Sequence, residues 1–289
     1  MFQIIGMVVV MVMVFGGFAL AGGHFDIIVK ALPFEFMMIG GAAMGAFLIG
    51  NSGKTVMKTL GDFGKIVSGP KWKTQDYRDL LALLFQLTKT MKTKGVIALE
   101  THIENPKDSA IFQNYPRILK DHFATDFICD TLRMMTMNLE DPHQVEDAME
   151  KQLEKHHHEV AGPAHALQNM ADALPALGIV AAVLGIIKTM GAIDSPPTVL
   201  GAKIGSALVG TFLGVFLAYG FVGPIAARMK EIYDEEHAFY LIIQSVLVAH
   251  LHGNAAQISV EIGRGNVPTK SQPSFAELEE ALSDIPNTA

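Results

Sequence analysis

The stretch PALGIVAAVLGIIKTMGAIDSPPTVLGAKIGSALVGTFLGVFLAYGFVGP, residues 175–224, decides the fold of this chain. It contains two apolar segments joined by a short turn, and small residues recur at intervals of four along both. The pairs are Gly178 with Ala182, Ala181 with Gly185, Ser206 with Gly210, and Gly210 with Gly214. Small residues at this spacing let two helix backbones approach closely inside a lipid bilayer. The stretch therefore predicts a packed hairpin of two membrane-spanning helices.

The composition of the whole chain indicates a membrane protein with a large aqueous part. Of the 289 residues, 50% are apolar and 18% are charged, whereas soluble proteins usually carry about 25% charged residues. The formal net charge is -7 and no basic stripe is present, which argues against nucleic acid as a partner. Cys129 is the only cysteine, so an intrachain disulfide and a cysteine-based zinc site are excluded.

Four stretches of the chain are apolar enough to cross a bilayer, which takes roughly 20 residues. They are residues 1–23, 36–53, 173–187 and 204–227. Pro33 is expected to begin the second span, because proline costs no hydrogen bond in the first turn of a helix. Glu35 and Asp172 then lie at span ends, so we expect no carboxylate inside any span. If the protein conducts ions, another chain has to supply the carrier.

Two features near the first span allow more than one interpretation. Ala19 and Ala21 resemble a signal-peptide cleavage site, but no lysine or arginine precedes residue 30, which favours a span that stays in the protein. Residues 24–35, HFDIIVKALPFE, are too few and too polar to cross the membrane. Their apolar residues fall on one helical face and predict an interfacial helix on the outer surface.

The basic residues predict the orientation. Of 22 lysines and arginines, 19 lie in the large middle segment or the tail, and only Lys30, Lys188 and Lys203 lie in the two short connections. Because basic residues favour the inside, we expect both termini in the cytoplasm; the resemblance described below implies that the membrane is the bacterial inner membrane. The expected divisions are two spans in 1–53, a helical cytoplasmic domain in 54–170, two spans in 171–227, and a cytoplasmic extension and tail in 228–289.

The aqueous segments have helical periodicity almost throughout, so the predicted fold class is all-α. The expected helices are an amphipathic one on the inner leaflet over 55–67, then 75–100, 118–139, one beginning at 141–142, and 228–252 and 275–282. The helix that begins at Asp141 and Pro142 has an N-cap followed by a proline. We expect it to run toward the third span, with an interruption or bend near Gly162 and Pro163.

Several polar residues and prolines invite a functional interpretation beside a structural one. Thr211 is the hydroxyl near the middle of the fourth span; it either bonds to its own helix or lines a pore. Pro175 and Pro224 either accommodate local packing or form a pair of kinks. The charged group at Lys89, Lys92, Lys94 and Glu100 is either a solvated face or a surface for a cytoplasmic partner.

Enzymatic and metal-site patterns are weak in this sequence. No P-loop, GxGxxG, HExxH or hydrolase motif occurs, so we expect neither an enzyme nor a bound cofactor. The run His156 to His158 contains three possible ligands, but three consecutive helical residues point in three directions. A solvated helix face is therefore the favoured interpretation, and no metal site is predicted.

Six segments resemble the flagellar motor stator A subunits of the MotA/TolQ/ExbB proton channel family. They are ENPKDSAIFQNYPRI, FICDTLR, LPALGIVAAVLG, VGTFLGVFLAYGFVGP, and VEIGR with PSFAELEE. The resemblance implies a ring of five copies around two B subunits, each of which supplies an ion-binding aspartate from its single span. It also implies that ion passage turns the ring, which drives the rotor switch protein.

The resemblance assigns roles to particular residues. Pro175 and Pro224 match the family's functional prolines, and Thr211 matches its pore hydroxyl. Lys92 and Glu100 match the charges that contact the rotor, although relatives commonly have arginine where Lys92 stands. Lysine keeps the charge but loses the bidentate fork, so long-range attraction is expected to survive better than a specific salt bridge.

The resemblance also bears on which ion is transported and on which other functions remain possible. Sodium-driven relatives carry a threonine where Ala181 and Ala182 stand, and Thr211 offers a single side-chain oxygen, which favours protons over sodium. The other functions considered are a sodium-driven stator, an energiser of outer-membrane transport like ExbB or TolQ, and a free-standing channel. Four spans rather than three disfavour the energiser, and the lack of intramembrane charge expected above disfavours the free-standing channel.

Overall fold

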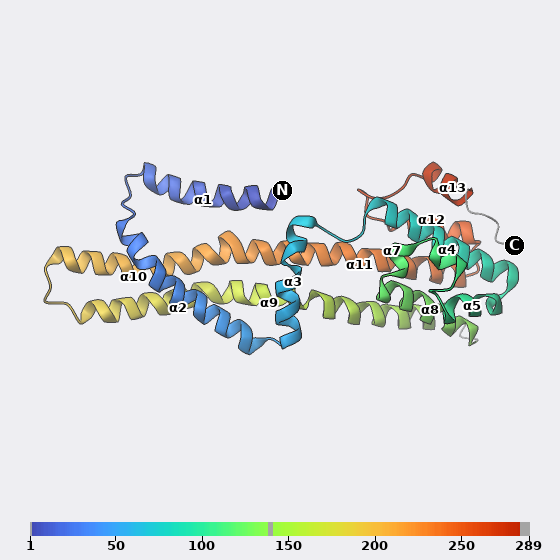
Figure 1. The fold of residues 1–289 in the computed structure, drawn as a ribbon, viewed down its shortest axis with the longest axis horizontal. Helices are drawn as coiled ribbons and strands as arrows, with labels where there is room; N and C mark the ends of the chain where they lie inside the picture. The colour runs from blue at the N-terminus through green and yellow to red at the C-terminus, as the bar shows by residue number, and fades with distance from the viewer. Residues whose placement is uncertain (1, 138–140, 284–289) are drawn as a thin grey trace. The chain divides into compact units, whose positions relative to one another are not determined.

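The computed structural model describes residues 2–137 and 141–283, and the regular structure in these ranges is helical throughout. Figure 1 labels most of the helices along the ribbon. In chain order they are α1 (Phe2–Leu20), α2 (Asp26–Gly50), α3 (Gly53–Ser68), α4 (Thr74–Lys94), the 3-10 turn η1 (Val96–Leu99), α5 (Glu100–Glu104), α6 (Ala110–Gln113), α7 (Pro116–Leu119), α8 (His122–Thr136), α9 (Pro142–Met190), α10 (Pro197–Leu217), the π-helical turn η2 (Ala218–Val222), α11 (Gly223–Leu251), α12 (Ala256–Gly265) and α13 (Phe275–Ser283).

The helices form two compact units. The membrane unit consists of residues up to Gly69 together with Val160–Ile232, and the core unit consists of Pro70–Glu159 together with the residues from Tyr233 onward. Four helical stretches in the described ranges are long and apolar enough to cross a membrane: Phe2–Leu20, Asp26–Gly50, Pro142–Met190 and Pro197–Leu251. The all-α fold with four candidate spans is therefore confirmed.

Helix α2 differs from the prediction at its beginning. It begins at Asp26, and Pro33 lies inside it. The expected interfacial helix over 24–35 is therefore wrong, because its residues from 26 onward form the first turns of α2. An acidic residue in the first turn suits the positive end of the helix dipole, which explains a start at Asp26. Glu35 consequently lies within the helix and is buried, so the expectation that span interiors lack a carboxylate is also wrong.

Prolines do not end the long helices. Helix α9 is continuous from Pro142 to Met190 with Pro163 and Pro175 inside, so the predicted interruption near Gly162 is wrong. The fourth span keeps its helix through Pro224 by a different route. The π-helical turn Ala218–Val222 comes immediately before it, and Gly223 N–H donates to the carbonyl of Ala218, five residues back. A π-turn widens the backbone and relieves the clash that proline makes with the preceding turn.

Glycine geometry explains two helix ends in the core unit, one of which differs from the prediction. Helix α4 ends at Lys94, not near residue 100, because Gly95 has φ +82°, a value that ordinary residues rarely adopt. Gly253, at φ +88°, follows the end of α11 as predicted.

Two further helices depart from the predicted boundaries. Residues 118–139 do not form one helix, because Asp121 caps a new helix that begins at His122; residues 138–140 lie outside the described ranges. Helix α12 was not predicted, and helix α13 confirms the amphipathic helix expected over 275–282.

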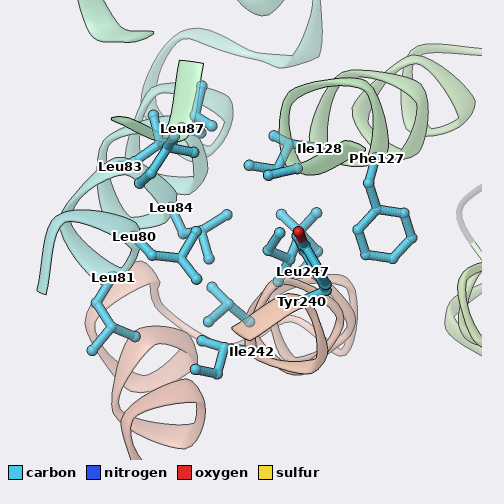
Figure 2. Close-up of a cluster of buried hydrophobic side chains, with 14 of the residues drawn as sticks. Leu80, Leu81, Leu83, Leu84, Leu87, Phe127, Ile128, Tyr240, Ile242 and Leu247 are labelled. Carbon is cyan, nitrogen blue, oxygen red and sulfur yellow. The ribbon is translucent and has the colours of Figure 1, made fainter. Parts of the chain in front are cut away.

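The hydrophobic core of the core unit joins α4, α8 and α11 (Figure 2). The apolar face predicted for α4 is buried there: Leu80, Leu81, Leu83, Leu84 and Leu87 are each 0% exposed. Phe127 and Ile128 of α8 and Ile242 and Leu247 of α11 are equally buried. Trp72 stacks on Phe239 with ring centroids 3.8 Å apart. Burial of this kind stabilises a fold by roughly 1.5–3 kcal/mol for each large side chain.

Candidate functional site

The two helices of the quoted hairpin touch at their glycines. A methyl group added at Gly214 would lie 2.6 Å from the carbonyl oxygen of Leu174 and 2.9 Å from the Cα of Gly178. One added at Gly185 would lie 2.7 Å from the Cβ of Ala207. Contacts this short are possible only because these positions lack side chains. The predicted close packing of α9 against α10 is therefore confirmed, and it supplies a rigid wall for whatever lies beside it.

Thr211 lies on a part of α10 that its own chain leaves uncovered. It is half-buried and lies between Leu208 and Val215, whose side chains are 59% and 42% exposed. Positions 208, 211 and 215 share one helical face. In the described part of the chain the Thr189 hydroxyl donates to Gly185 O at 2.8 Å, whereas the Thr211 hydroxyl makes no hydrogen bond. The alternative in which Thr211 bonds to its own helix therefore does not hold.

Ala182 of α9 lies beside the α10 residue that precedes Thr211. It is half-buried, and its backbone nitrogen would lie 3.2 Å from a methyl group added at Gly210, the residue before Thr211. The same position would meet the Glu35 carboxylate at 2.7 Å. The structure thus brings Ala182 and Thr211 to one helix crossing, and it adds a carboxylate that sequence reasoning placed at a span end. The presence of lysine and aspartate before Pro33 was the signal that α2 begins earlier.

Pro224 follows a glycine that packs beside the helix turn weakened by Pro175. Pro175 lacks the N–H that would bond to Ala171, and a methyl group added at Gly223 would lie 3.9 Å from the Cβ of Ala171. Gly223 directly precedes Pro224. The weakened turn of α9 therefore lies beside the π-turn of the next helix. Two adjacent interruptions in hydrogen bonding make this the place where the two helices bend most easily.

Lys92 in the core unit contacts the end of α11. Its Nζ lies 3.4 Å from the carbonyl oxygen of Gly253 and 3.5 Å from that of Asn254. A cation at a helix C-terminus is favoured by the helix dipole. Burial, followed by the positive charge of Lys92, lowers the pKa of His250. Lys92 is therefore exposed but held in place, unlike a freely moving surface lysine.

Glu100 is exposed in the first turn of α5. Within residues 2–137 and 141–283, no hydrogen bond or ion pair joins it to Lys92. The two charges are thus presented separately by α4 and α5, on either side of the turn at Gly95.

The three consecutive histidines are not grouped. His156 stacks on Phe123 with ring centroids 3.5 Å apart, while His157 Nε2 lies 3.2 Å from Asp234 Oδ1. His158 is exposed. No group of metal-binding side chains occurs in the described residues.

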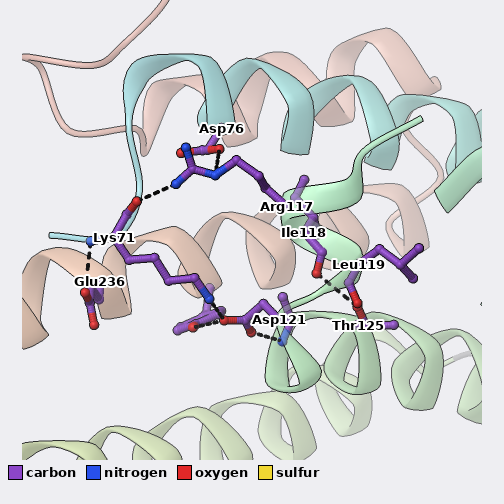
Figure 3. Close-up of polar contacts among 10 residues, drawn as sticks. Lys71, Asp76, Arg117, Ile118, Leu119, Asp121, Thr125 and Glu236 are labelled. Carbon is purple, nitrogen blue, oxygen red and sulfur yellow. Dashed lines mark hydrogen bonds and ion pairs between the residues drawn. The ribbon is translucent and has the colours of Figure 1, made fainter. Parts of the chain in front are cut away.

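A polar network fixes the start of α4 against α7 and α11 (Figure 3). Arg117 Nε lies 3.0 Å from Asp76 Oδ1, and Arg117 also donates to Lys71 O at 2.8 Å. The Lys71 side chain pairs with Asp121, the residue that caps α8, and Lys71 N–H donates to Glu236 at 2.9 Å. These bonds tie together segments that are far apart in sequence, and they hold the start of α4, the helix that carries Lys92.

The tail is held to α4 by another pair of charges. Glu277 Oε1 accepts from Arg78 Nη2 at 2.6 Å, and Glu277 Oε2 accepts the N–H of Ser274 at the start of α13. Arg264 donates to the carbonyl of Pro273 at 3.1 Å. The quoted segments VEIGR and PSFAELEE thus have a structural use, which is to fasten the tail helix to the core unit.

Known proteins resemble the chain over nearly its whole length. Residues 4–95 match the motility protein A N-terminal family, and residues 119–240 match the MotA/TolQ/ExbB proton channel family. Motility protein A of Salmonella typhimurium is 40% identical over 99% of this chain and 97% of its own, and that of Escherichia coli is 39% identical over the same shares. The chemotaxis protein LafT of Vibrio parahaemolyticus is 34% identical over 98% of both chains.

Solved structures have the same fold. A structure of C. jejuni MotAB superposes with a TM-score of 0.70 at 18% identity, covering 94% of this chain and 98% of the other. A flagellar MotAB stator complex from Bacillus subtilis gives 0.69 at 22% identity, covering 95% and 98%. At these identities the structures support the fold, and the relatives support the family. The chain therefore belongs to the motility protein A family, the stator subunits of the bacterial flagellar motor, within the MotA/TolQ/ExbB proton channel family.

Proposed function

We propose that this stator subunit forms a proton path together with a one-span B subunit and converts proton flow into torque on the rotor. The observation that carries the proposal is a face of α10 that residues 2–137 and 141–283 leave partly uncovered, where Thr211, whose hydroxyl has no hydrogen bond within these ranges, lies between Leu208 and Val215. Exposed apolar side chains on a membrane span can contact either lipid or another helix. A hydroxyl that makes no hydrogen bond in the described residues favours contact with a helix that carries a polar group.

The partner is a B subunit whose single span carries an aspartate. Relatives of known structure form MotAB complexes, which supports such a partner here. Five copies of the A chain would surround two B spans, with Thr211 and Ala182 facing the path. Both termini and the core unit would lie in the cytoplasm, as the basic residues favour. Lipid would cover α1, which has no buried residue.

The adjacent weak points at Pro175 and Pro224 would pass movement from the path to the helices beyond it. Small residues allow α9 and α10 to move as a pair, because their mutual contact leaves no gap for independent motion. The pair then bends where Pro175 removes one backbone hydrogen bond of α9 and where the π-helical turn joins residues five apart instead of four.

Reconstitution in liposomes tests the conducting function. The chain alone should pass no protons, and the chain with its B subunit should pass them when a membrane potential is applied. Proton flux through the A chain alone would favour a free-standing channel instead. Rotation that follows external sodium at fixed pH would favour the sodium-driven alternative.

Charge reversal at Lys92 tests the rotor contact. We expect K92E to impair swimming, and a compensating charge reversal on the rotor switch protein to restore it, since long-range attraction depends on opposite charge. Because Lys92 also contacts the end of α11, K92Q is the control: it removes the charge without reversing it and should impair swimming less. If no charge swap restores K92E, the role of Lys92 is confined to the α11 end.

A further inference from the structure

Glu35 is a carboxylate inside a membrane-spanning helix. It follows the first residue of α2 by nine positions, which places it about 14 Å along the helix axis. The residue is 5% exposed, and in the described part of the chain its Oε2 atom is buried without a hydrogen-bond partner. Acidic residues at such positions are costly, and those that persist usually serve ion or proton transfer.

The atoms around the Glu35 carboxylate leave space for it but do not neutralise it. A methyl group at Gly210 would lie 2.7 Å from Glu35 Oε2, 3.2 Å from Ala181 Cβ and 3.2 Å from Ala182 N. The carboxylate therefore occupies the space that a side chain at 210 would take. Helix backbone and a methyl group supply no positive charge, so the group needs either a proton or a bound cation to be stable there.

A cavity connects this carboxylate to charged helix ends. Its volume is about 640 Å³, and its lining includes Glu35 with six further polar residues: Asp26, Lys30, Lys188, Thr189, Lys203 and Ser206. Asp26 and Lys30 are in the first turns of α2, Lys188 is in the last turn of α9, and Lys203 is near the start of α10. The three lysines are those of the two short connections, so the cavity opens at the side of the membrane where these connections lie.

The composition of the site favours a proton over a metal cation. Dehydrating sodium requires several oxygen ligands, but the Thr189 hydroxyl already donates to Gly185 O, and Glu35 Oε2 points to the side of Gly210 that also faces Ala181 Cβ and Ala182 N. A proton needs a single carboxylate oxygen and leaves a neutral acid. The neutral acid suits the low-dielectric surroundings, whereas the charged form depends on lysines that line the same cavity without an ion pair to Glu35 in the described part of the chain.

We propose that Glu35 is a proton-binding group that takes up protons through this cavity and feeds the path beside Thr211. A hydronium ion in the cavity transfers a proton to the Glu35 carboxylate; an O–H bond forms and a water molecule is left. The acid then releases the proton to water beside Gly210 and Thr211, and the carboxylate is restored. The inference rests on the proposed function, because it adds an entry group to the same path.

Rotation speed measured against external pH tests the role of Glu35. The chain is expressed with its B subunit in cells that lack their own stator, as wild type, E35Q, E35D and D194N. We expect E35Q to lose speed several-fold at high external pH, where protons are scarce, and little at low pH. E35D should keep the shape of the wild-type curve, and D194N, at an exposed carboxylate in the turn between α9 and α10 that does not line the cavity, should superpose on it. An E35Q curve that matches wild type at every pH overturns the proposal.

Infrared spectroscopy of the purified complex gives a readout that does not depend on rotation. Wild type and D194N should show a protonated-carboxyl band that responds to pH and moves in heavy water, and E35Q should lack it. If E35Q does not assemble, E35D decides: a shifted band supports the site, and an unshifted band overturns it. If wild-type rotation follows sodium and ignores pH while the band still responds, the proposed proton drive fails and the proton-binding site stands.

Discussion

The contact between α9 and α10 makes a sharp prediction at Gly214. In the substitution G214A, the new methyl group would lie 2.6 Å from Leu174 O and 2.9 Å from Gly178 Cα. Carbon atoms normally pack at about 3.5–4.0 Å, so the helices must separate by roughly half an ångström or more. Overpacking of this kind costs about 1–3 kcal/mol. At about 2–4 °C per kcal/mol, the unfolding temperature should fall by roughly 2–12 °C.

The matched control is G201A on the same helix. Gly201 has no atom within 4 Å of the added methyl group. The same substitution there gains only the greater helix propensity of alanine, roughly 0.5–1 kcal/mol. Both variants are purified in one detergent, and helix content is followed by circular dichroism during heating. We expect G201A to melt at or above the wild-type temperature, with G214A clearly below it. Equal melting of the two variants would refute the close contact between the helices.

Three further predictions concern other elements. R117A should destabilise the protein by about 1–3 kcal/mol, because the Asp76 side chain, which is 1% exposed, loses its ion pair. The loss should lie at the lower end of this range, because the Arg117 side chain is 54% exposed. Chemical denaturation measures the change, with K120A as the control at an exposed site. Burial, followed by the charge of His157, lowers the pKa of His237 from 6.5 to about 4. Between pH 6.5 and about 4, the unfolded chain therefore binds a proton at His237 that the folded chain does not bind, so the stability should decline as the pH falls through this range. H237Q should flatten this decline, whereas H122Q should not. Finally, P224A should slow rotation without loss of the complex, because a regular helical turn can replace η2. The control P163A lies far from the π-helical turn in sequence and should slow rotation less. Equal effects of the two substitutions would contradict a special role of Pro224.

Much of the fold follows from periodicity and composition. Charge-free apolar runs predicted four spans, and the apolar spacing of α4 predicted the leucines that the structure buries. Gly69, at φ +78°, and Gly253 end helices where the sequence indicated a break. These features are local, because helix length, turn geometry and the burial of one face depend on residues close in sequence.

The errors lie where local rules compete with packing. Pro33 is typical of a helix start, yet α2 continues through it because the apolar residues before it extend the span and Asp26 suits its first turn. Gly162 and Pro163 likewise do not interrupt α9. Inside a packed bundle, neighbouring helices compensate for the lost hydrogen bond, and sequence patterns alone do not include that compensation.

The sequence by itself determined the membrane class, the helical fold, the small-residue hairpin and the positions of Pro175, Thr211 and Pro224. The tertiary structure decided which groups meet. It placed Glu35 against Gly210, Thr211 on an uncovered face, and Lys92 at the end of α11. The physical reason is that each of these contacts joins helices that are distant in sequence. A glycine shows that space is needed, but only the packed helices show that a carboxylate fills it.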